Sequence, residues 1–196
     1  MTAAPIHPWQ VILASASPRR RELIAGLDLS VSITRVDVDE TPSPGTPLRE
    51  VAEELAVRKS HAWPGTLGPD QVLITADTTV LLHDRLLNKP ADDEEARSML
   101  HALSGVTHEV VTGVCLRTSG ELISFSDVAS VRFADLSDAE IEHYIRHYSP
   151  LDKAGAYGVQ DWIGHTGVER IEGSYFTVMG LPTHRVYRAI KELRPT

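Results

Sequence analysis

The sequence predicts an α/β fold in which two lobes share one central mixed sheet. Short apolar runs bounded by small polar residues alternate with segments of helical period along the whole chain. No segment is repeated, and no stretch has the composition of a linker between separable domains. The 196 residues, 42% of them hydrophobic, are enough for one substantial core. We therefore expect a single domain over residues 1–196.

Each element in the first half follows from a local pattern of apolar residues and end signals. The expected elements are a buried strand over 11–14, a helix over 19–24 with Pro18 in its first turn and Gly26 at its end, a half-buried strand over 31–36, a helix that opens at Thr46-Pro47 with Thr46 as N-cap and ends at Pro64-Gly65, a buried strand over 72–76, and a hairpin over 79–87.

The second half continues the alternation and adds one irregular region. The expected elements are a helix from about Asp92 to Gly105, two strands over 107–118 and 121–133 joined by a hairpin at Ser119-Gly120, a helix from the capping box of Ser137 and Glu140 to about Tyr148, strands over 168–171 and 175–179, and a helix over 183–193. Residues 150–167 have several glycines and no clean period, which indicates a functional loop.

Composition excludes several classes of protein. The formal net charge of −8 argues against binding of a nucleic acid polymer, although a small polyphosphate needs only a few placed cations. The single cysteine, Cys115, lies in an apolar run and is expected to fill the core. No segment approaches the length of a membrane span, and no signal peptide pattern opens the chain, so we expect a cytoplasmic protein.

The stretch from Ser15 to Arg21 places hydroxyls and guanidinium groups between a strand end and a helix start. Cations at a helix N-terminus oppose the helix dipole, so this placement favours a bound anion. A phosphate would satisfy the hydroxyls of Ser15 and Ser17, the backbone amides and the forks of Arg19 and Arg20. A solvated basic helix start is the alternative.

Carboxylates follow two of the expected strands. Asp77 comes directly after the run 72–76, where an α/β fold commonly binds ligands, and it could hold a divalent cation, activate a water, or do both. The acidic run 37–40 ends in Glu40, and a Mg²⁺ site needs only one or two protein carboxylates beside phosphate oxygens. Ordinary turn and loop carboxylates are the alternative.

Residues 152–160 contain small residues that permit close approach of the backbone to a ligand. Gln160 offers both a donor and an acceptor, which is the pattern needed to read the edge of a base. A flexible surface loop with a neutral glutamine is the alternative interpretation.

Taken in order, these stretches resemble the Maf family of nucleoside triphosphate pyrophosphatases, from Leu13 to Leu181. The anchors are Ser15-Ala16-Ser17-Pro18-Arg19-Arg20, Asp39-Glu40, Lys59, Ala76-Asp77-Thr78, Lys89-Pro90, Leu103-Ser104-Gly105, residues 152–160, Gly173-Ser174-Tyr175 and residues 178–182. Three positions depart from the family pattern: Thr79 stands where a hydrophobic residue is usual, Asn88 where a small or acidic residue is usual, and Asp161-Trp162 where glycine is common.

The resemblance implies a fold similar to inosine triphosphatase, with a nucleotide-binding cleft between two lobes and a divalent metal, Mg²⁺ or Mn²⁺. It implies cleavage of a nucleoside triphosphate between the α and β phosphates. Asp77 matches the proton acceptor, and Glu40, Lys59 and Lys89 match other active-site positions. We expect Glu40 and Asp77 to hold the metal, because both are carboxylates that follow expected strands. Arg19, Thr78 and Gln160 match positions associated with substrate choice.

The identities at those positions are similar to the branch that acts on dTTP and UTP. Two alternatives remain open at this point: a non-catalytic nucleotide sensor that regulates cell division, and a pyrophosphatase that prefers modified purine nucleotides. The expected partner is a small nucleoside triphosphate, with neither a membrane nor a nucleic acid polymer, and a homodimer is left open.

Overall fold

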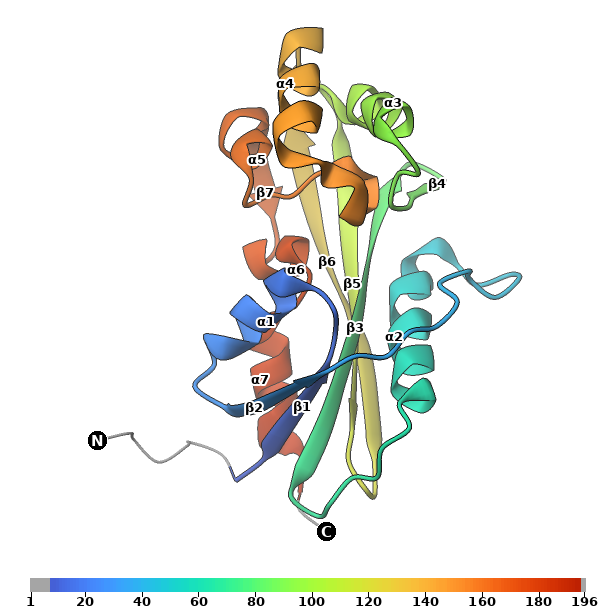
Figure 1. Cartoon of the computed structure of the whole chain (residues 1–196), viewed down its shortest axis with the longest axis vertical. Helices are drawn as coiled ribbons and strands as arrows, with labels where there is room; N and C mark the ends of the chain where they lie inside the picture. The colour runs from blue at the N-terminus through green and yellow to red at the C-terminus, as the bar shows by residue number, and fades with distance from the viewer. Residues whose placement is uncertain (1–7, 195–196) are drawn as a thin grey trace. The chain divides into compact units, whose positions relative to one another are not determined.

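A computed structural model describes residues 8–194, which form an α/β fold with a central mixed sheet, as predicted (Figure 1). In chain order the elements are β1 (Gln10–Ala14), α1 (Pro18–Ala25), β2 (Ser30–Thr34), η1 (Leu48–Glu50), α2 (Val51–Ala62), β3 (Gln71–Leu82), β4 (Arg85–Leu87), α3 (Asp93–Leu103), β5 (Thr107–Arg117), β6 (Leu122–Phe133), α4 (Asp138–Tyr148), η2 (Pro150–Asp152), η3 (Ala154–Ala156), α5 (Trp162–Gly167), β7 (Val168–Glu172), α6 (Tyr175–Met179) and α7 (Thr183–Glu192).

The described residues form one seven-stranded sheet in the order β2-β1-β3-β5-β6-β7, with β4 paired to β3. Strand β1 runs parallel to both β2 and β3, with Leu13 opposite Ile33 and Ile74. Strand β4 is antiparallel to β3, and β7 is antiparallel to β6. Strands β1 and β2 end together, with Ala14 opposite Thr34, whereas β3 continues past Ile74 to Leu82.

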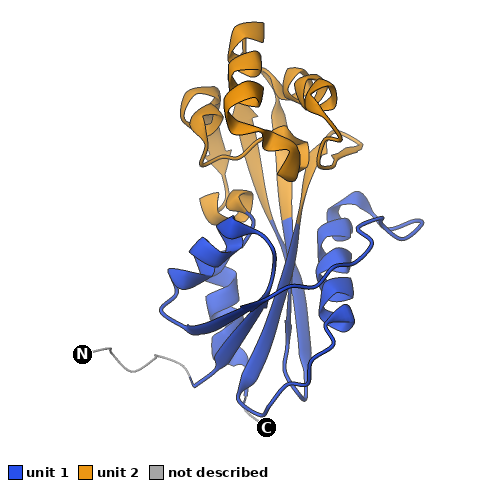
Figure 2. Cartoon of the chain, viewed as in Figure 1, with its two compact units in different colours: residues 1–77, 112–127, 180–196 blue, residues 78–111, 128–179 orange. Residues whose placement is uncertain are grey.

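The chain divides into two compact units (Figure 2). Unit 1 consists of the described parts of residues 1–77, 112–127 and 180–196, and unit 2 consists of residues 78–111 and 128–179. Strands β3, β5 and β6 contribute residues to both units.

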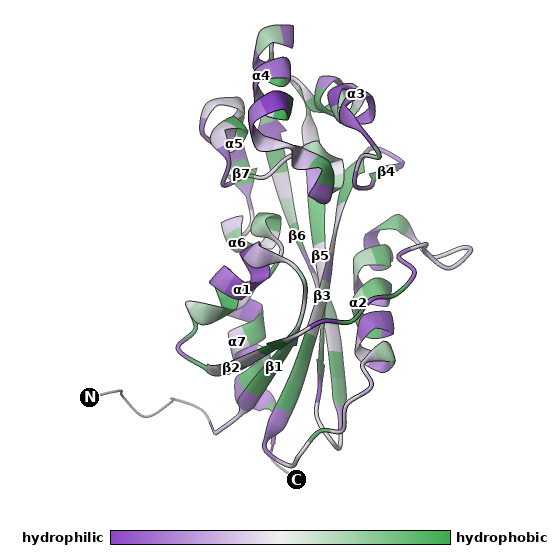
Figure 3. Cartoon of the chain, viewed as in Figure 1, coloured by the Kyte–Doolittle hydropathy of each residue, from purple (hydrophilic) through white to green (hydrophobic). Residues whose placement is uncertain are grey.

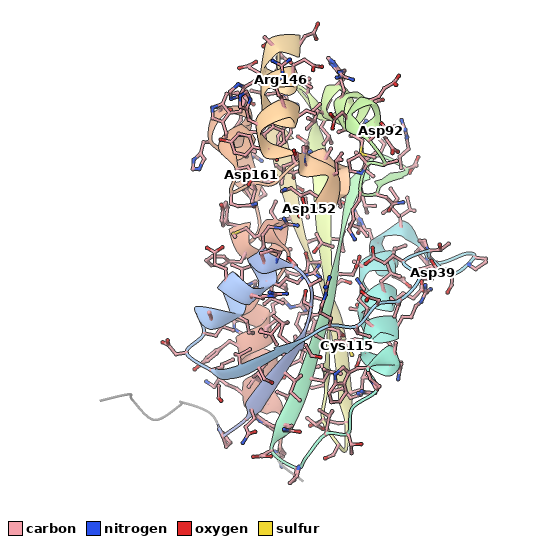
Figure 4. The ribbon with its side chains drawn as sticks, viewed as in Figure 1. Asp39, Asp92, Cys115, Arg146, Asp152 and Asp161 are labelled. Carbon is pink, nitrogen blue, oxygen red and sulfur yellow. The ribbon has the colours of Figure 1, made fainter. Side chains whose placement is uncertain are left out.

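In unit 1, helix α2 lies on one side of the strands, whereas α1 and α7 lie on the other (Figure 1). Hydrophobic residues are frequent along the strands of this unit, whereas α1 and α2 show both hydrophilic and hydrophobic residues (Figure 3). Cys115 on β5 is fully buried, and burial raises the pKa of its thiol (Figure 4). The expectation that Cys115 fills the core is therefore confirmed.

In unit 2, helix α3 contacts α4 and the short helix η3. Helix α4 begins with the predicted capping box: the Ser137 hydroxyl accepts a hydrogen bond from the Glu140 amide, and the Glu140 carboxylate accepts one from the Ser137 amide. Tyr144 and Ile141 on α4 are fully buried. The capping box and the apolar face together fix where α4 starts and which side of it packs.

Two predictions for unit 2 gave the wrong type of secondary structure. Residues 175–179 form the helix α6 instead of a strand, because Ser174 accepts backbone hydrogen bonds from both Thr177 and Val178. The expected loop over 150–167 contains the helix α5 and two short helical turns. Short apolar segments do not distinguish a strand from one helical turn, so tertiary context decides.

Two predictions for unit 1 are also corrected. Thr46 is not a helix N-cap, because α2 begins at Val51 after a 3₁₀ turn, and the Thr46 hydroxyl instead donates to Glu54 at 2.8 Å. The expected strand over 72–76 extends without a break to Leu82. Asp77 consequently lies in the middle of β3 instead of following its end.

Close packing of α2 on the sheet depends on Gly113 of β5. A Cβ atom at this position would lie 2.2 Å from the backbone of Ala52 and Glu53 in α2, a distance that real Cβ atoms do not adopt. Since both obstructing groups are backbone atoms, no rotamer change relieves the clash. The glycine therefore sets how closely α2 approaches β5.

We expect Gly113→Ala to lower the free energy of unfolding by about 2 kcal/mol or more, because α2 must move outward. Urea denaturation followed by circular dichroism measures the change. Gly68→Ala is the matched control, since a Cβ there meets only ordinary contacts at 3.5 Å and beyond, and its effect should stay within about 0.5 kcal/mol. Equal stabilities of the two variants would contradict this role for Gly113.

Candidate functional site

The centre of the site in unit 1 is the ammonium group of Lys59, which contacts two carboxylates. Its Nζ lies 2.5 Å from Oδ1 of Asp77 and 2.7 Å from Oε1 of Glu40. Lys59 and Asp77 are buried at 8% exposure each, whereas Glu40 is exposed. Three residues separated by up to 37 positions in the chain therefore meet at one point, and we call them the Lys59 cluster.

Packing of α2 against β3 explains why Lys59 reaches Asp77. Ala56 and Lys59 are three residues apart and lie on the same face of α2. Thr75 and Asp77 are two residues apart and lie on the same face of β3. The buried hydroxyl of Thr75 donates to the carbonyl of Ala56 at 2.6 Å, which fixes the level of the helix along the strand. One helical turn further, Lys59 stands against Asp77.

The segment that carries Glu40 is tied to α2 by hydrogen bonds to Arg58 and Glu54, which also pair with each other. Arg58 donates to the carbonyls of Asp39 and Thr41 at 2.6 and 2.7 Å and also contacts Glu54. Glu54 accepts hydrogen bonds from the amide and the hydroxyl of Ser43. These hydrogen bonds, of which the one from the Ser43 hydroxyl contributes most, lower the pKa of the Glu54 carboxyl to about 2. The segment is thereby held beside Lys59 (Asp39 is labelled in Figure 4).

The serines before α1 are positioned by hydrogen bonds between neighbours. The hydroxyl of buried Ser15 accepts from the amide of Ser17 at 3.2 Å, and the Ser17 hydroxyl accepts from the amide of Arg20 as the N-cap of α1. The Ser15 amide itself donates to Thr34 of β2. The turn is thus built around its two hydroxyls, and Pro18 occupies the first helical position as predicted.

Arg20 has a structural role that the sequence did not predict. Its Nε donates to the carbonyl of Gly180 and its Nη1 to the carbonyl of Ala76, both at 2.8 Å. Burial lowers the pKa of Arg20, against the opposing charge of Asp77. The guanidinium therefore joins α1 to β3 one residue before Asp77. Arg19 lies in the first turn of the same helix and is partly buried.

The three other predicted site residues, Thr78, Lys89 and Gln160, belong to unit 2. Thr78 follows Asp77 on β3 and is partly buried, and alternation along the strand turns it to the opposite face. Lys89 is exposed just after β4, and the carbonyl of the preceding Asn88 accepts a hydrogen bond from Gly155 at 3.1 Å. That bond links the Lys89 segment to the segment that leads to Gln160.

The segment before Gln160 is anchored in the core of unit 2 through Tyr157. The Tyr157 hydroxyl lies 2.7 Å from Nε2 of His108, and both rings pack edge-on against Phe133. His108 is 2% exposed, and burial lowers its pKa to about 4. Gln160 is partly buried, with its Nε2 2.9 Å from Oδ1 of Asp161.

The Lys59 cluster joins a buried cation to carboxylates, and carboxylates are ligands for a hard divalent cation. No group of three or more His, Cys, Asp or Glu side chains that could hold a metal occurs within residues 8–194. The two carboxylates that converge on Lys59 still fit Mg²⁺ or Mn²⁺, because such ions take one or two protein carboxylates beside phosphate oxygens and water.

Sequence reasoning had identified Glu40, Lys59 and Asp77, and the structure brings them together. It had not identified Thr75, Arg58 or Glu54, which position them. The spacing of Glu54 and Arg58, four residues apart in an expected helix, was a usable signal for an ion pair. The contact of Thr75 with Ala56 left no local signal, because it depends on how α2 docks on the sheet.

The fold and the site define an α/β protein with a lysine and carboxylate cluster on a central mixed sheet. A family model described as "Maf-like protein" matches residues 10–193. The chain therefore belongs to the Maf-like protein family. None of the helices within residues 8–194 is long and apolar enough to cross a membrane.

Curated relatives match over nearly the full length of both chains. The dTTP/UTP pyrophosphatase of Phocaeicola vulgatus is 48% identical over 189 residues, which cover 96% of this chain and 98% of the relative. The dTTP/UTP pyrophosphatase of Parabacteroides distasonis is 45% identical, with 95% and 97% covered. The protein of the same name from Porphyromonas gingivalis is 44% identical, with 95% and 96% covered.

The buried His108 makes stability depend on pH. Its pKa falls from the ordinary 6.5 to about 4 on folding, so below pH 6.5 the unfolded chain binds a proton that the folded chain does not. The folded state loses up to about 3 kcal/mol relative to the unfolded state as pH falls from 6.5 to 4. We expect His108→Gln to flatten this part of the profile of urea stability against pH.

The matched control is His165→Gln, which changes an exposed histidine of the same unit. Its stability should follow the wild-type profile between pH 6.5 and 4. If His108→Gln also runs parallel to wild type, burial of the neutral ring does not contribute to acid sensitivity.

Proposed function

We propose that the chain is a nucleoside triphosphate pyrophosphatase that hydrolyses dTTP and UTP to the nucleoside monophosphate and pyrophosphate. The observation that carries the proposal is the near-complete coverage by relatives named dTTP/UTP pyrophosphatase, 44 to 48% identical to this chain. The Lys59 cluster supports it, because an anhydride hydrolase needs a cation for the phosphates and a carboxylate for the water.

The cationic groups of the chain neutralise the triphosphate. Lys59, Arg19, Arg20 and Lys89 supply positive charge, and the hydroxyls of Ser15 and Ser17 supply hydrogen bonds beside the start of α1. Negative charge moves toward the pyrophosphate as it leaves, so fixed cations stabilise the transition state more than the bound substrate. Thr78 and Gln160 contribute to the choice of base.

Asp77 acts as the proton acceptor. Its carboxylate takes a proton from the attacking water while the new bond from oxygen to the α phosphorus forms, and the bond from that phosphorus to the bridging oxygen breaks. The electron pair of the broken bond leaves with pyrophosphate. Lys59, at 2.5 Å, holds the Asp77 carboxylate in place through this step.

Glu40 and Asp77 would hold the divalent metal, Mg²⁺ or Mn²⁺. When bound, such an ion would supply further neutralisation of the phosphates and lower the pKa of a bound water. The exposed Glu40 and the buried Asp77 offer oxygen ligands from two different elements. Lys59 would keep both carboxylates oriented.

The proposal places the protein in the cytoplasm as an enzyme that clears the nucleotide pool, with a small nucleotide as its partner. The formal net charge of −8 argues against a nucleic acid polymer as a partner. The proposal allows the chain to act as a monomer or as a homodimer. The structural cleft expected from the resemblance stays a prediction.

A panel of nucleotides tests the function directly. With Mg²⁺ or Mn²⁺, we expect equimolar nucleoside monophosphate and pyrophosphate from UTP and dTTP, measured by chromatography and by coupled pyrophosphate detection. Release of orthophosphate with a nucleoside diphosphate would contradict the proposed bond cleavage. Binding without turnover would favour a nucleotide sensor, and a preference for modified purines would overturn the assignment of the substrate.

We expect Asp77→Asn to lower the turnover of UTP by about a hundredfold or more, because the amide keeps the shape but cannot accept the proton. Circular dichroism should show a folded chain, since Lys59 keeps its contact with Glu40. The control Asp70→Asn makes the same change just before β3, at an exposed residue, and should retain turnover. Near-normal turnover of Asp77→Asn would remove Asp77 from the mechanism.

A further inference from the structure

A chain of hydrogen bonds within unit 2 ends on the side chain of Gln160. The amide of Gly158 donates to the Tyr144 hydroxyl at 3.0 Å, and that hydroxyl donates to Oδ2 of Asp161 at 2.7 Å. The other oxygen of Asp161, Oδ1, accepts from Nε2 of Gln160 at 2.9 Å. Asp161 thus stands between a fully buried tyrosine of α4 and the amide of Gln160 (Asp161 is labelled in Figure 4).

This contact determines which way the amide of Gln160 faces. A carboxylate only accepts hydrogen bonds, so the group of Gln160 that faces Asp161 must be the NH₂. The carbonyl oxygen, Oε1, is then on the other side of the amide. Within the described residues Oε1 is buried and has no hydrogen-bond partner. A buried carbonyl without a donor is costly, and a ligand that brings an N–H group would satisfy it.

The surroundings prevent the amide from turning over. Burial and the hydrogen bond to Asp161 raise the pKa of Tyr144, so its hydroxyl remains a donor to Asp161. A Cβ on Gly158 would lie 2.6 Å from both Oδ2 of Asp161 and Nε2 of Gln160, so these side chains occupy the space that the glycine leaves. A flipped amide would point its carbonyl oxygen at the carboxylate.

We propose that Asp161, held by Tyr144, is a positioning residue that fixes the Gln160 amide with its carbonyl oxygen toward the base and so selects pyrimidines that carry an N3–H donor. Uracil and thymine have that donor, whereas cytosine presents an acceptor at N3. Against a fixed carbonyl oxygen, cytosine would leave two acceptors facing each other. This inference rests on the proposed function and adds the residue that enforces its selectivity.

The test compares specificity constants, kcat/KM, for UTP, dTTP and CTP in the full chain. Asp161→Asn replaces an acceptor-only group with one that can donate or accept, so the Gln160 amide loses its fixed orientation. We expect the ratio of UTP to CTP to fall about tenfold, while kcat for UTP changes less than about threefold. Tyr144→Phe, which removes the donor to Asp161, should shift the ratio in the same direction.

Two matched comparisons sharpen the result. Asp138→Asn makes the same chemical change at an exposed position at the start of α4 and should leave the ratio unchanged. Gln160→Leu removes the amide itself, and its ratio sets the limit that Asp161→Asn should approach. With 3-methyl-UTP, which lacks the N3–H donor, wild type should lose much more activity relative to UTP than Asp161→Asn does.

An unchanged ratio in Asp161→Asn and Tyr144→Phe would overturn the inference, as would an equal loss for all nucleotides. Calorimetric binding of UMP and CMP provides a readout that does not need turnover. If wild type binds UMP better than CMP and Asp161→Asn does not, the inference holds even where pyrophosphate release fails. Absence of release from every nucleotide in wild type would count against the proposed function alone.

Discussion

The contact between the ammonium of Lys59 and the buried carboxylate of Asp77 is the interaction on which unit 1 depends. A buried charge needs a partner, and the ammonium of Lys59 has two, Asp77 at 2.5 Å and Glu40 at 2.7 Å. The packing around this pair fixes the position of α2. Gly113 leaves room for the backbone of α2, and the Thr75 hydroxyl bonds to the carbonyl of Ala56, one turn before Lys59. The placement of the helix is therefore inseparable from the chemistry of the site.

In unit 2, hydrogen bonds hold the neutral side chain of Gln160 in one orientation. Its polar groups form a connected series from Gly158 through Tyr144 and Asp161 to Gln160. A buried polar network of this kind rigidifies its members when each has a partner. Only Oε1 of Gln160, among the atoms of this series, lacks one in the described chain. In the proposed function, cationic side chains of unit 1 serve the triphosphate and the oriented amide of unit 2 serves the base.

Local signals in the sequence predicted the fold class, the helix start at Pro18 and the capping box of Ser137, because each depends on residues within one turn. They failed for residues 175–179, where five apolar and polar residues fit either a strand or a helical turn. The cluster of Glu40, Lys59 and Asp77 was reached by resemblance, but not the carbonyl contacts of Arg20 or the tie between Tyr144 and Asp161. Those contacts join residues 17 to 160 positions apart and arise only from packing.

A double-mutant cycle between Lys59 and Asp77 tests most directly whether the two residues act as one unit. The measurement is kcat/KM for UTP in wild type, Lys59→Met, Asp77→Asn and the double variant, each shown to be folded by circular dichroism. If the ammonium holds the carboxylate that accepts the proton, each single change removes most of the activity and the double variant is within about threefold of the weaker single variant. Losses that multiply in the double variant would contradict the account.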